Sequence, residues 1–214
     1  MNKQGGLNNT MNKCVLLSIR PQWCELIASG KKTVEVRKSR PKLETPFKCY
    51  IYCTLSGSPE AFESWGKDVA KWNRKNWGER KGKVIGEFVC DQIYGIYYSI
   101  YPHDPLVFEE IGTLNRPDLM AETCLSEIEI NDYLDGETGY GWHISALQIY
   151  DKPRELGELY FPPEKYCEKE LCGGCPHDQM PDVNGEYAYD CEWRRPITRA
   201  PQSWCYVEEY DGKR

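Results

Sequence analysis

The sequence predicts an α+β fold, in which short strands form a small mixed or antiparallel β-barrel with short helices at its rim. Apolar and polar residues alternate in several stretches between residues 14 and 150, and only two stretches carry the signals of a helix. The strands and helices do not follow one another in βαβ order, which disfavours a parallel sheet covered by helices. A chain of 214 residues has room for one domain of ordinary size and a small extension.

The chain opens on a tail, a strand and a helix. Residues 1–12 contain no apolar run, so we expect a flexible tail and not a secretory signal. The apolar residues 14–19 predict the first strand. Pro21 suits the first position of a helix, and Gly30 ends that helix.

The next stretch reads SGKKTVEVRK over residues 29–38. Its apolar side chains, Val34 and Val36, have a period of two, so Glu35 and Arg37 point to the opposite face. This pattern predicts a half-buried strand. Glu35 and Arg37 either line a binding cleft or form an ion pair on a solvated surface.

Later stretches complete the predicted barrel. Residues 47–55, 82–93 and 139–150 alternate in the same way and predict further strands. Ser126 and Glu129 have the spacing of a capping box, which predicts that a short helix begins there.

Charge is distributed unevenly along the chain. Residues 1–90 hold 17 Lys and Arg against 8 Asp and Glu, and residues 91–214 hold 10 against 25, so charges of +9 and −15 make up the net −6. A basic half favours a polyanionic partner such as RNA or single-stranded nucleic acid, although charged stretches are also ordinary solvated surface. No stretch has the roughly 18 apolar residues of a membrane span, so we expect a cytoplasmic protein without a membrane segment.

Residues 64–83 interleave basic side chains with Trp65, Trp72 and Trp77. Stacking of bases on aromatic rings, combined with backbone charge, is how many proteins hold single strands. The alternative is that the tryptophans belong to the core and only the basic residues are exposed.

A cysteine-rich stretch near the C-terminus predicts a structural zinc site. Cys172 and Cys175 have the C-x₂-C spacing at which two thiolates hold one metal ion. The candidate ligands are Cys167, Cys172, Cys175 and Cys191. His177 or Cys205 is an alternative for one of them, and a loop of free cysteines is the alternative to a metal site.

Three stretches together resemble the ASCH domain of the PUA-like superfamily, especially the ASCH proteins of bacteria and their phages. They read LLSIRPQWCELIASGKKTVEVRK, GKVIGEFVCD and GYGWHISALQIYDKP, and the resemblance extends over about residues 14–152. We therefore expect a PUA-like (ASCH) β-barrel domain at residues 13–153. Residues 154–214 then form a small Cys-rich extension that ends in a strand.

The resemblance implies a cleft between the first helix and the barrel, which receives RNA, a nucleotide or a single modified base. The residues expected to bind the ligand are Lys31, Lys32, Glu35, Arg37, Trp23, Trp204 and Gln202. Lys32 is expected to be partly exposed, so that its loss leaves stability nearly unchanged. For Trp204 the alternative is a last strand, in which its ring and that of Tyr206 cover the barrel.

One branch of the family hydrolyses the acetyl amide of acetylated cytidine, which makes an amidohydrolase the alternative function. The Lys of that branch is matched by Lys32, its Thr is replaced by Glu35, and its Glu is matched only loosely by Glu122. These three are the candidate catalytic residues. A carboxylate in place of the hydroxyl puts negative charge where an oxyanion forms, so the sequence favours binding over catalysis.

Overall fold

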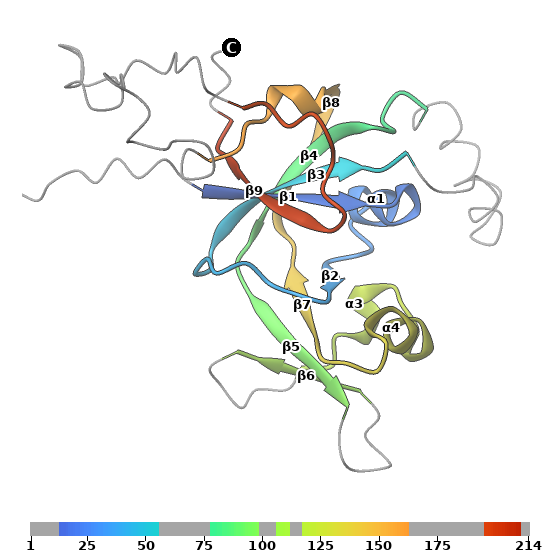
Figure 1. Cartoon of the computed structure of the whole chain (residues 1–214). Helices are drawn as coiled ribbons and strands as arrows, with labels where there is room; N and C mark the ends of the chain where they lie inside the picture. The colour runs from blue at the N-terminus through green and yellow to red at the C-terminus, as the bar shows by residue number, and fades with distance from the viewer. Residues whose placement is uncertain (1–12, 56–77, 99–105, 112–116, 163–194, 211–214) are drawn as a thin grey trace, which may run out of the picture.

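The computed structural model describes residues 13–55, 78–98, 106–111, 117–162 and 195–210. Their strands form two sheets, with short helices beside them (Figure 1). Within these ranges, no helix is long and apolar enough to cross a membrane.

The first sheet has five strands. Their order is β8 (Ser145–Arg154), β4 (Lys83–Cys90), β3 (Phe47–Cys53), β1 (Lys13–Ile19) and β9 (Trp204–Glu208). β1 and β3 are parallel, and the other neighbours are antiparallel. Two parallel neighbours need a crossover connection between them. Here that connection contains helix α1 (Pro21–Ala28) and strand β2 (Val34–Arg37), which belongs to the other sheet.

The second sheet has four strands, all antiparallel to their neighbours. Their order is β2, β7 (Gly139–His143), β5 (Ile93–Tyr98) and β6 (Leu106–Glu110). The end strand β2 pairs with β7 through the register Glu35 to Trp142 and Arg37 to Tyr140.

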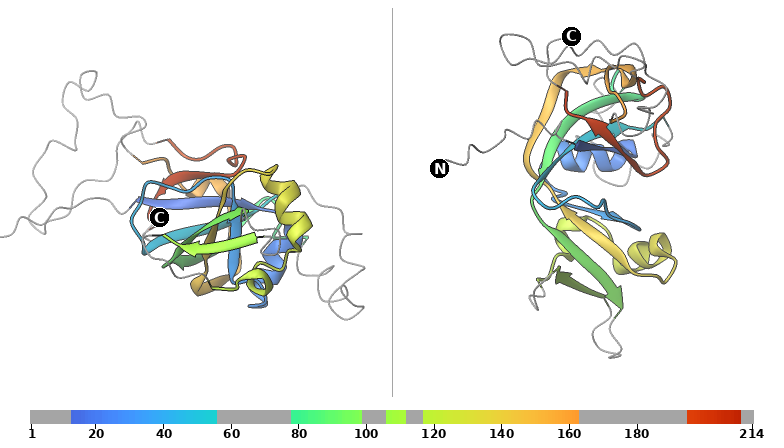
Figure 2. Two further views of the ribbon diagram at one scale, coloured as in Figure 1. Left: turned by 90° about the horizontal axis from the view of Figure 1, so that it is seen from below. Right: turned by 60° about the vertical axis from the view of Figure 1, so that its left-hand side comes forward.

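The two sheets are joined at a bend. β4 continues into β5, and β7 continues into β8, with no more than two residues between the strands of each pair. Figure 2 shows the long strands curving from one sheet into the other. The backbone N–H of His143 donates to the Gln92 carbonyl at 2.9 Å at this bend. The α+β class with helices at the rim is confirmed, and the strands of the expected barrel are grouped in two sheets that share this corner.

The helices begin and end as their sequences predict. Pro21 occupies the first turn of α1, and Gly30 follows that helix with a φ of 72°. α3 (Met120–Thr123) precedes α4 (Glu127–Leu134), and a single 3₁₀ turn, η2 (Leu156–Glu158), follows β8. Ser126 caps α4, and both hydrogen bonds of the predicted capping box are present.

Three clusters of buried apolar side chains hold these elements together. The largest contains Trp142 with side chains of β1, α1, β3 and β4. A second lies on the other face of the five-stranded sheet, around Tyr50 and Leu159. In the third, Ile130 and Leu134 of α4 pack against the four-stranded sheet, which fixes α4 beside β2.

Two expectations about strands are corrected. All four residues of β2 are buried, so the strand is not half-buried, because the side chains of Glu35 and Arg37 are covered by the first sheet and the segment before β9. The predicted strand 139–150 is two strands, which are separated at Ile144, and Ala146, with a φ of 45°, follows near the start of β8.

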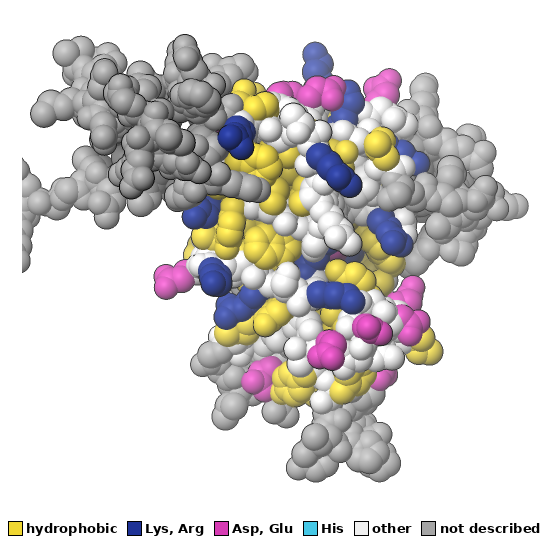
Figure 3. Space-filling view, viewed as in Figure 1, with side chains coloured by type: hydrophobic (Ala, Val, Ile, Leu, Met, Phe, Trp, Pro, Cys, Tyr) yellow, Lys and Arg dark blue, Asp and Glu magenta, His cyan; other side chains and the backbone are white. Residues whose placement is uncertain are grey.

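Figure 3 shows the surface of the face drawn in Figure 1. Basic side chains surround a group of hydrophobic side chains in the centre of this face, and acidic side chains gather over the region of α4. Other acidic side chains lie at the upper and left edges of this face, so basic and acidic side chains are not fully separated on it.

Candidate functional site

A cavity of about 880 Å³ lies between α1, β2, α4 and the segment before β9. Its lining residues are Ser18, Ile19, Arg20, Gln22, Trp23, Lys32, Glu35, Val36, Arg37, Lys38, Ser39, Thr54, Leu125, Glu129, Asp132, Tyr133, Gln202 and Ser203. Ligand pockets in proteins have volumes of roughly 300–1,000 Å³, so this one has room for a nucleotide. It lies beside the first helix, where the sequence predicts a cleft.

Lys32 is buried, with only 2% of its surface exposed. Its ammonium donates to the Thr123 carbonyl at 2.6 Å and lies 3.4 Å from Glu35 Oε2. It also lies 5.4 Å from the centre of the Trp23 ring. The expectation of a partly exposed Lys32 is therefore wrong, because α3 and the Trp23 ring cover its side chain.

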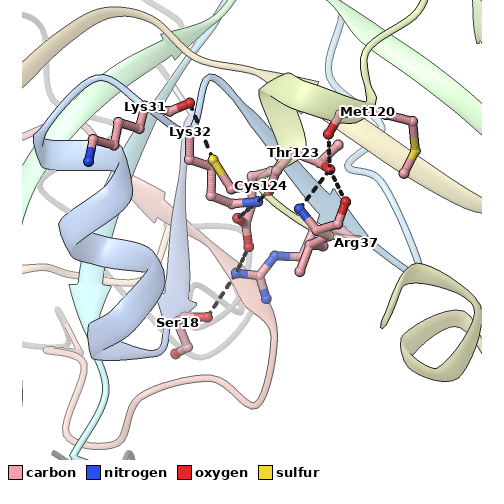
Figure 4. Close-up of polar contacts among 9 residues, drawn as sticks. Ser18, Lys31, Lys32, Arg37, Met120, Thr123 and Cys124 are labelled. Carbon is pink, nitrogen blue, oxygen red and sulfur yellow. Dashed lines mark hydrogen bonds and ion pairs between the residues drawn. The ribbon is translucent and has the colours of Figure 1, made fainter. Parts of the chain in front are cut away.

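Burial lowers the pKa of Lys32, because an ammonium loses hydration there, and the negative charge of Glu35 opposes that shift. The lysine is therefore held as an ion pair in a site from which water is largely excluded. Figure 4 shows the Lys32 and Arg37 side chains extending toward each other from the two ends of the same segment.

Arg37 shares Glu35 with Lys32 and ties β2 to the first sheet. Its Nη2 lies 2.9 Å from Glu35 Oε1 and donates to the Ser18 carbonyl at 2.8 Å. Its Nη1 lies at the 3.5 Å limit of a hydrogen bond to Ser203 Oγ. Two buried cations therefore share one buried carboxylate, which leaves an excess of positive charge along this wall of the cavity.

Two polar atoms of the cavity residues lack a hydrogen-bond partner among the described residues. They are the amide oxygen of Gln22 and Nε of Arg37, and both atoms are buried. A buried donor or acceptor without a partner costs about 1–3 kcal/mol, so such atoms are uncommon unless a ligand or water completes them. The Gln22 oxygen is an acceptor, and Arg37 Nε is a donor.

The other lining residues include two aromatic side chains and two carboxylates. Trp23 of α1 is partly exposed, and Tyr133 of α4 is 39% exposed. Glu129 and Asp132, also on α4, are exposed and line the cavity. A flat ligand can stack on a ring here, while an anionic group is disfavoured next to α4.

The structure brings five of the seven predicted ligand-binding residues to the cavity. These are Lys32, Glu35, Arg37, Trp23 and Gln202. Lys31 is exposed and is absent from the lining, and its carbonyl accepts from the Cys124 thiol at 3.3 Å (Figure 4).

Trp204 is also absent from the lining. It begins β9, packs 6.1 Å from the Trp142 ring centre and donates through Nε1 to Ser39 Oγ at 3.1 Å. This agrees with the alternative in which Trp204 belongs to a last strand that covers the sheet.

Of the three candidate catalytic residues, Lys32 and Glu35 line the cavity and Glu122 does not. The Glu122 carbonyl accepts from the Thr33 backbone at 3.0 Å, which fixes the entry to β2. Its Oε2 is buried and has no hydrogen-bond partner among the described residues.

Gln22, Lys38 and Tyr133 line the cavity but were not among the predicted residues. The sequence contains a signal for Gln22, because this residue precedes Trp23 in the first turn of the predicted helix. Lys38 directly follows the predicted strand. The sequence contains no signal that Tyr133 lines the cavity, because no local pattern indicates that α4 lies beside β2.

One segment of the chain is similar to a known protein family. Residues 17–84 match the family model of the ASCH domain, and this segment contains the cavity residues of α1 and β2. This segment, about a third of the chain, is similar to the ASCH domain.

Solved structures similar to this chain include those of an ASCH protein from Zymomonas mobilis. The crystal structure of ASCH from that organism is 18% identical, with coverage of 91% of this chain and 87% of that one and a TM-score of 0.47. Structures of two single-residue mutants of the protein are each 17% identical, with TM-scores of 0.46 and 0.47. They cover 92% and 94% of this chain, and 91% and 92% of their own. No curated protein matches the sequence.

The predicted zinc ligands Cys167, Cys172, Cys175 and Cys191 lie outside the described residues, as do His177 and the tryptophans of residues 64–83. Within the described ranges, no cluster of three or more His, Cys, Asp or Glu side chains is placed to hold a metal ion. Cys205, the alternative ligand, lies in β9. The zinc site stays a prediction.

Proposed function

We propose that this chain binds a nucleotide or a single-stranded nucleic acid by taking one base into the cavity between α1, β2 and α4. The observation that carries the proposal is that two residues lining the cavity each hold a polar atom without a hydrogen-bond partner among the described residues, the Gln22 amide oxygen and Arg37 Nε. The edge of a nucleobase presents a donor beside an acceptor, which are the two kinds of partner that these atoms need.

Aromatic and charged groups around the cavity support the same ligand. The Trp23 ring offers a face on which a base can stack, and stacking on an aromatic ring contributes about 1–3 kcal/mol per base. Lys32 and Arg37 outnumber the carboxylate they share, so the wall attracts carbonyl oxygens and phosphate.

Hydrolysis of an acylated base is a weaker candidate for this site. Amide hydrolysis needs a group that activates water and a donor for the oxyanion. The Lys32 ammonium is already engaged by the Thr123 carbonyl and Glu35, and Glu122 does not line the cavity. Binding needs no rearrangement of these contacts, whereas hydrolysis does.

Gln22→Met tests the proposal, because it removes the amide and keeps the length of the side chain. We expect the affinity for nucleoside monophosphates to fall about tenfold, as a lost hydrogen bond to a buried partner costs about 1–3 kcal/mol. The free energy of unfolding should be unchanged or higher, because an unsatisfied buried oxygen is removed. Calorimetric titration and chemical denaturation measure the two quantities.

Gln148→Met is the matched control, since Gln148 is exposed on β8, away from the cavity. It should leave both affinity and stability unchanged. Equal affinities for the Gln22→Met variant and the wild type would overturn the assignment of the base to this cavity. Turnover of acetylcytidine by the wild type would favour the hydrolase instead.

A further inference from the structure

We propose that the three exposed cations after β2 form a track for the nucleotides next to the base in the cavity, so that the partner is a single strand of several nucleotides. We call these three residues, Lys38, Arg40 and Lys42, the cationic track. The proposal rests on the proposed function, because the track begins where the cavity ends, and it names the substrate class that the cavity alone leaves open.

Three of the first five residues after β2 are cations on the surface. Lys38, Arg40 and Lys42 are exposed, and Pro41 between them is buried. Glu44 is the one acidic residue between β2 and β3. A row of cations at every second residue suits a chain of phosphates better than a single anion.

Two of the three cations of the track lie beside a partly exposed aromatic ring. The Lys38 ammonium is 5.8 Å from the Tyr133 ring centre, and the Arg40 guanidinium is 5.8 Å from that of Tyr140. Rings interleaved with cations are the usual surface for single strands, because every base has a face that can stack and every nucleotide has a phosphate.

The track is held against the body of the domain. The Lys42 backbone N–H donates to the Tyr206 hydroxyl at 2.8 Å, and Trp204 Nε1 donates to Ser39 Oγ at 3.1 Å. Both partners belong to β9, so the loop is fastened at two points to the five-stranded sheet. A surface that is ordered before binding loses less entropy when the ligand arrives.

The track is continuous with the cavity, since Lys38 and Ser39 line it. The exposed carboxylates of Glu129 and Asp132, on the same helix as the Tyr133 ring beside Lys38, also line the cavity and repel phosphate. In Figure 3, basic side chains surround the hydrophobic centre of this face, and a group of acidic ones lies over the region of α4. A strand whose base occupies the cavity therefore leaves along the cations and away from α4.

The triple variant Lys38→Gln, Arg40→Gln, Lys42→Gln tests the track. We expect its affinity for a fluorescent single-stranded RNA of about eight nucleotides to fall about tenfold or more at low salt. The slope of log affinity against log salt should become shallower by about two, since each lost phosphate contact removes about 0.7. Affinity for a nucleoside monophosphate should stay within about twofold of the wild type, because the cavity is intact.

The matched control is Lys152→Gln, Arg195→Gln, Arg199→Gln, which removes the same charge at three exposed residues that do not line the cavity. It should bind the oligonucleotide like the wild type. Equal losses in the two triple variants would overturn the track, because net charge alone would then explain the effect. Binding to phosphatidylserine vesicles without binding to the oligonucleotide would overturn it as well.

The two proposals can fail separately. Gln22→Met should weaken both the mononucleotide and the oligonucleotide, whereas the track variant weakens the oligonucleotide alone. If the wild type binds mononucleotides and the track variant binds the oligonucleotide normally, the track is wrong and the cavity proposal stands. If Gln22→Met changes neither affinity, the proposed function is wrong.

Discussion

At the scale of single residues, Lys32 is held by more contacts than a surface lysine would have. Its ammonium has a carbonyl, a carboxylate and an aromatic ring around it, and they come from α3, β2 and α1. A charge without its partner inside a protein is strongly unfavourable, so each of these groups depends on the others. The residue therefore supports the wall of the cavity and does not act as a free cation.

Lys32→Met tests this role. We expect the free energy of unfolding to fall by about 2–4 kcal/mol, because Glu35 loses one of its two cations and the Thr123 carbonyl loses its donor. Lys31→Met is the control, since exposed Lys31 is the next residue in the chain, and it should change stability by less than about 0.5 kcal/mol. Equal effects of the two substitutions in urea denaturation would show that Lys32 contributes no more than a surface charge.

At the scale of elements, the cavity depends on how closely α4 lies against β7. Gly139 opens β7, and a β-carbon there would lie 2.5 Å from Leu134 Cδ2 and 3.2 Å from the Arg37 carbonyl. Leu134 is buried and has little room to move. The glycine lets α4, which supplies the acidic wall, approach the sheet closely.

Gly139→Ala should displace α4 and so change the cavity. We expect a loss of stability of about 1–3 kcal/mol, the usual cost of overpacking a core, together with weaker mononucleotide binding. Gly157→Ala is the matched control, because a β-carbon at Gly157 meets no atom of the described residues within 4 Å. Thermal unfolding and calorimetric titration check both variants. Unchanged binding by the Gly139→Ala variant would mean that the position of α4 does not matter to the ligand.

The sequence predicts correctly those elements that depend on local signals. The proline at the start of α1, the positive φ of Gly30 and the capping box of Ser126 are all set by neighbours in the chain. It missed the burial of Lys32, because the carbonyl that binds this lysine belongs to Thr123, 91 residues away. Period two placed Glu35 and Arg37 on one face, but the cover over that face comes from the segment before β9.

At the scale of the whole molecule, the fold brings the basic and the acidic halves of the chain to one cavity. The basic N-terminal half supplies α1, β2 and the cationic track, and the later half supplies the carboxylates of α4. Elsewhere the two halves form ion pairs, as Lys48 does with Glu209 and Lys83 with Glu155. Net charge alone, at −6, would have argued against a polyanionic partner.

Buried thiols also act on the whole molecule, through the dependence of stability on pH. Burial raises the pKa of Cys14 and of Cys90 from the ordinary 9.0 to about 12, with nearby carboxylates adding to the shift. Between pH 9 and 12 the unfolded chain has lost these protons while the folded domain keeps them. Stability is therefore full below pH 9 and falls as pH rises through this window, by about 1.4 kcal/mol per pH unit for each thiol.

Lys32 acts in the opposite direction. Its pKa is lowered in the folded domain, so between that lowered value and its ordinary 10.5 the unfolded chain binds more protons, and stability rises with pH. Cys24 and Cys49 also have raised pKa values, so Lys32 opposes several buried thiols and we expect a net loss of stability above pH 9.

Cys14→Ala isolates one of these contributions. The variant is less stable than the wild type at pH 7, because a buried side chain becomes smaller. The difference in free energy of unfolding between the wild type and the variant should shrink as pH rises above 9. Only the wild type has the Cys14 thiol, whose raised pKa makes stability fall in this range. Val15→Ala, at the next buried position of β1, has no titrating group and should keep a constant difference from the wild type. Denaturation in reducing buffer at pH 7, 9 and 10 measures both, and parallel curves for the Cys14→Ala variant and the wild type would contradict a raised pKa at Cys14.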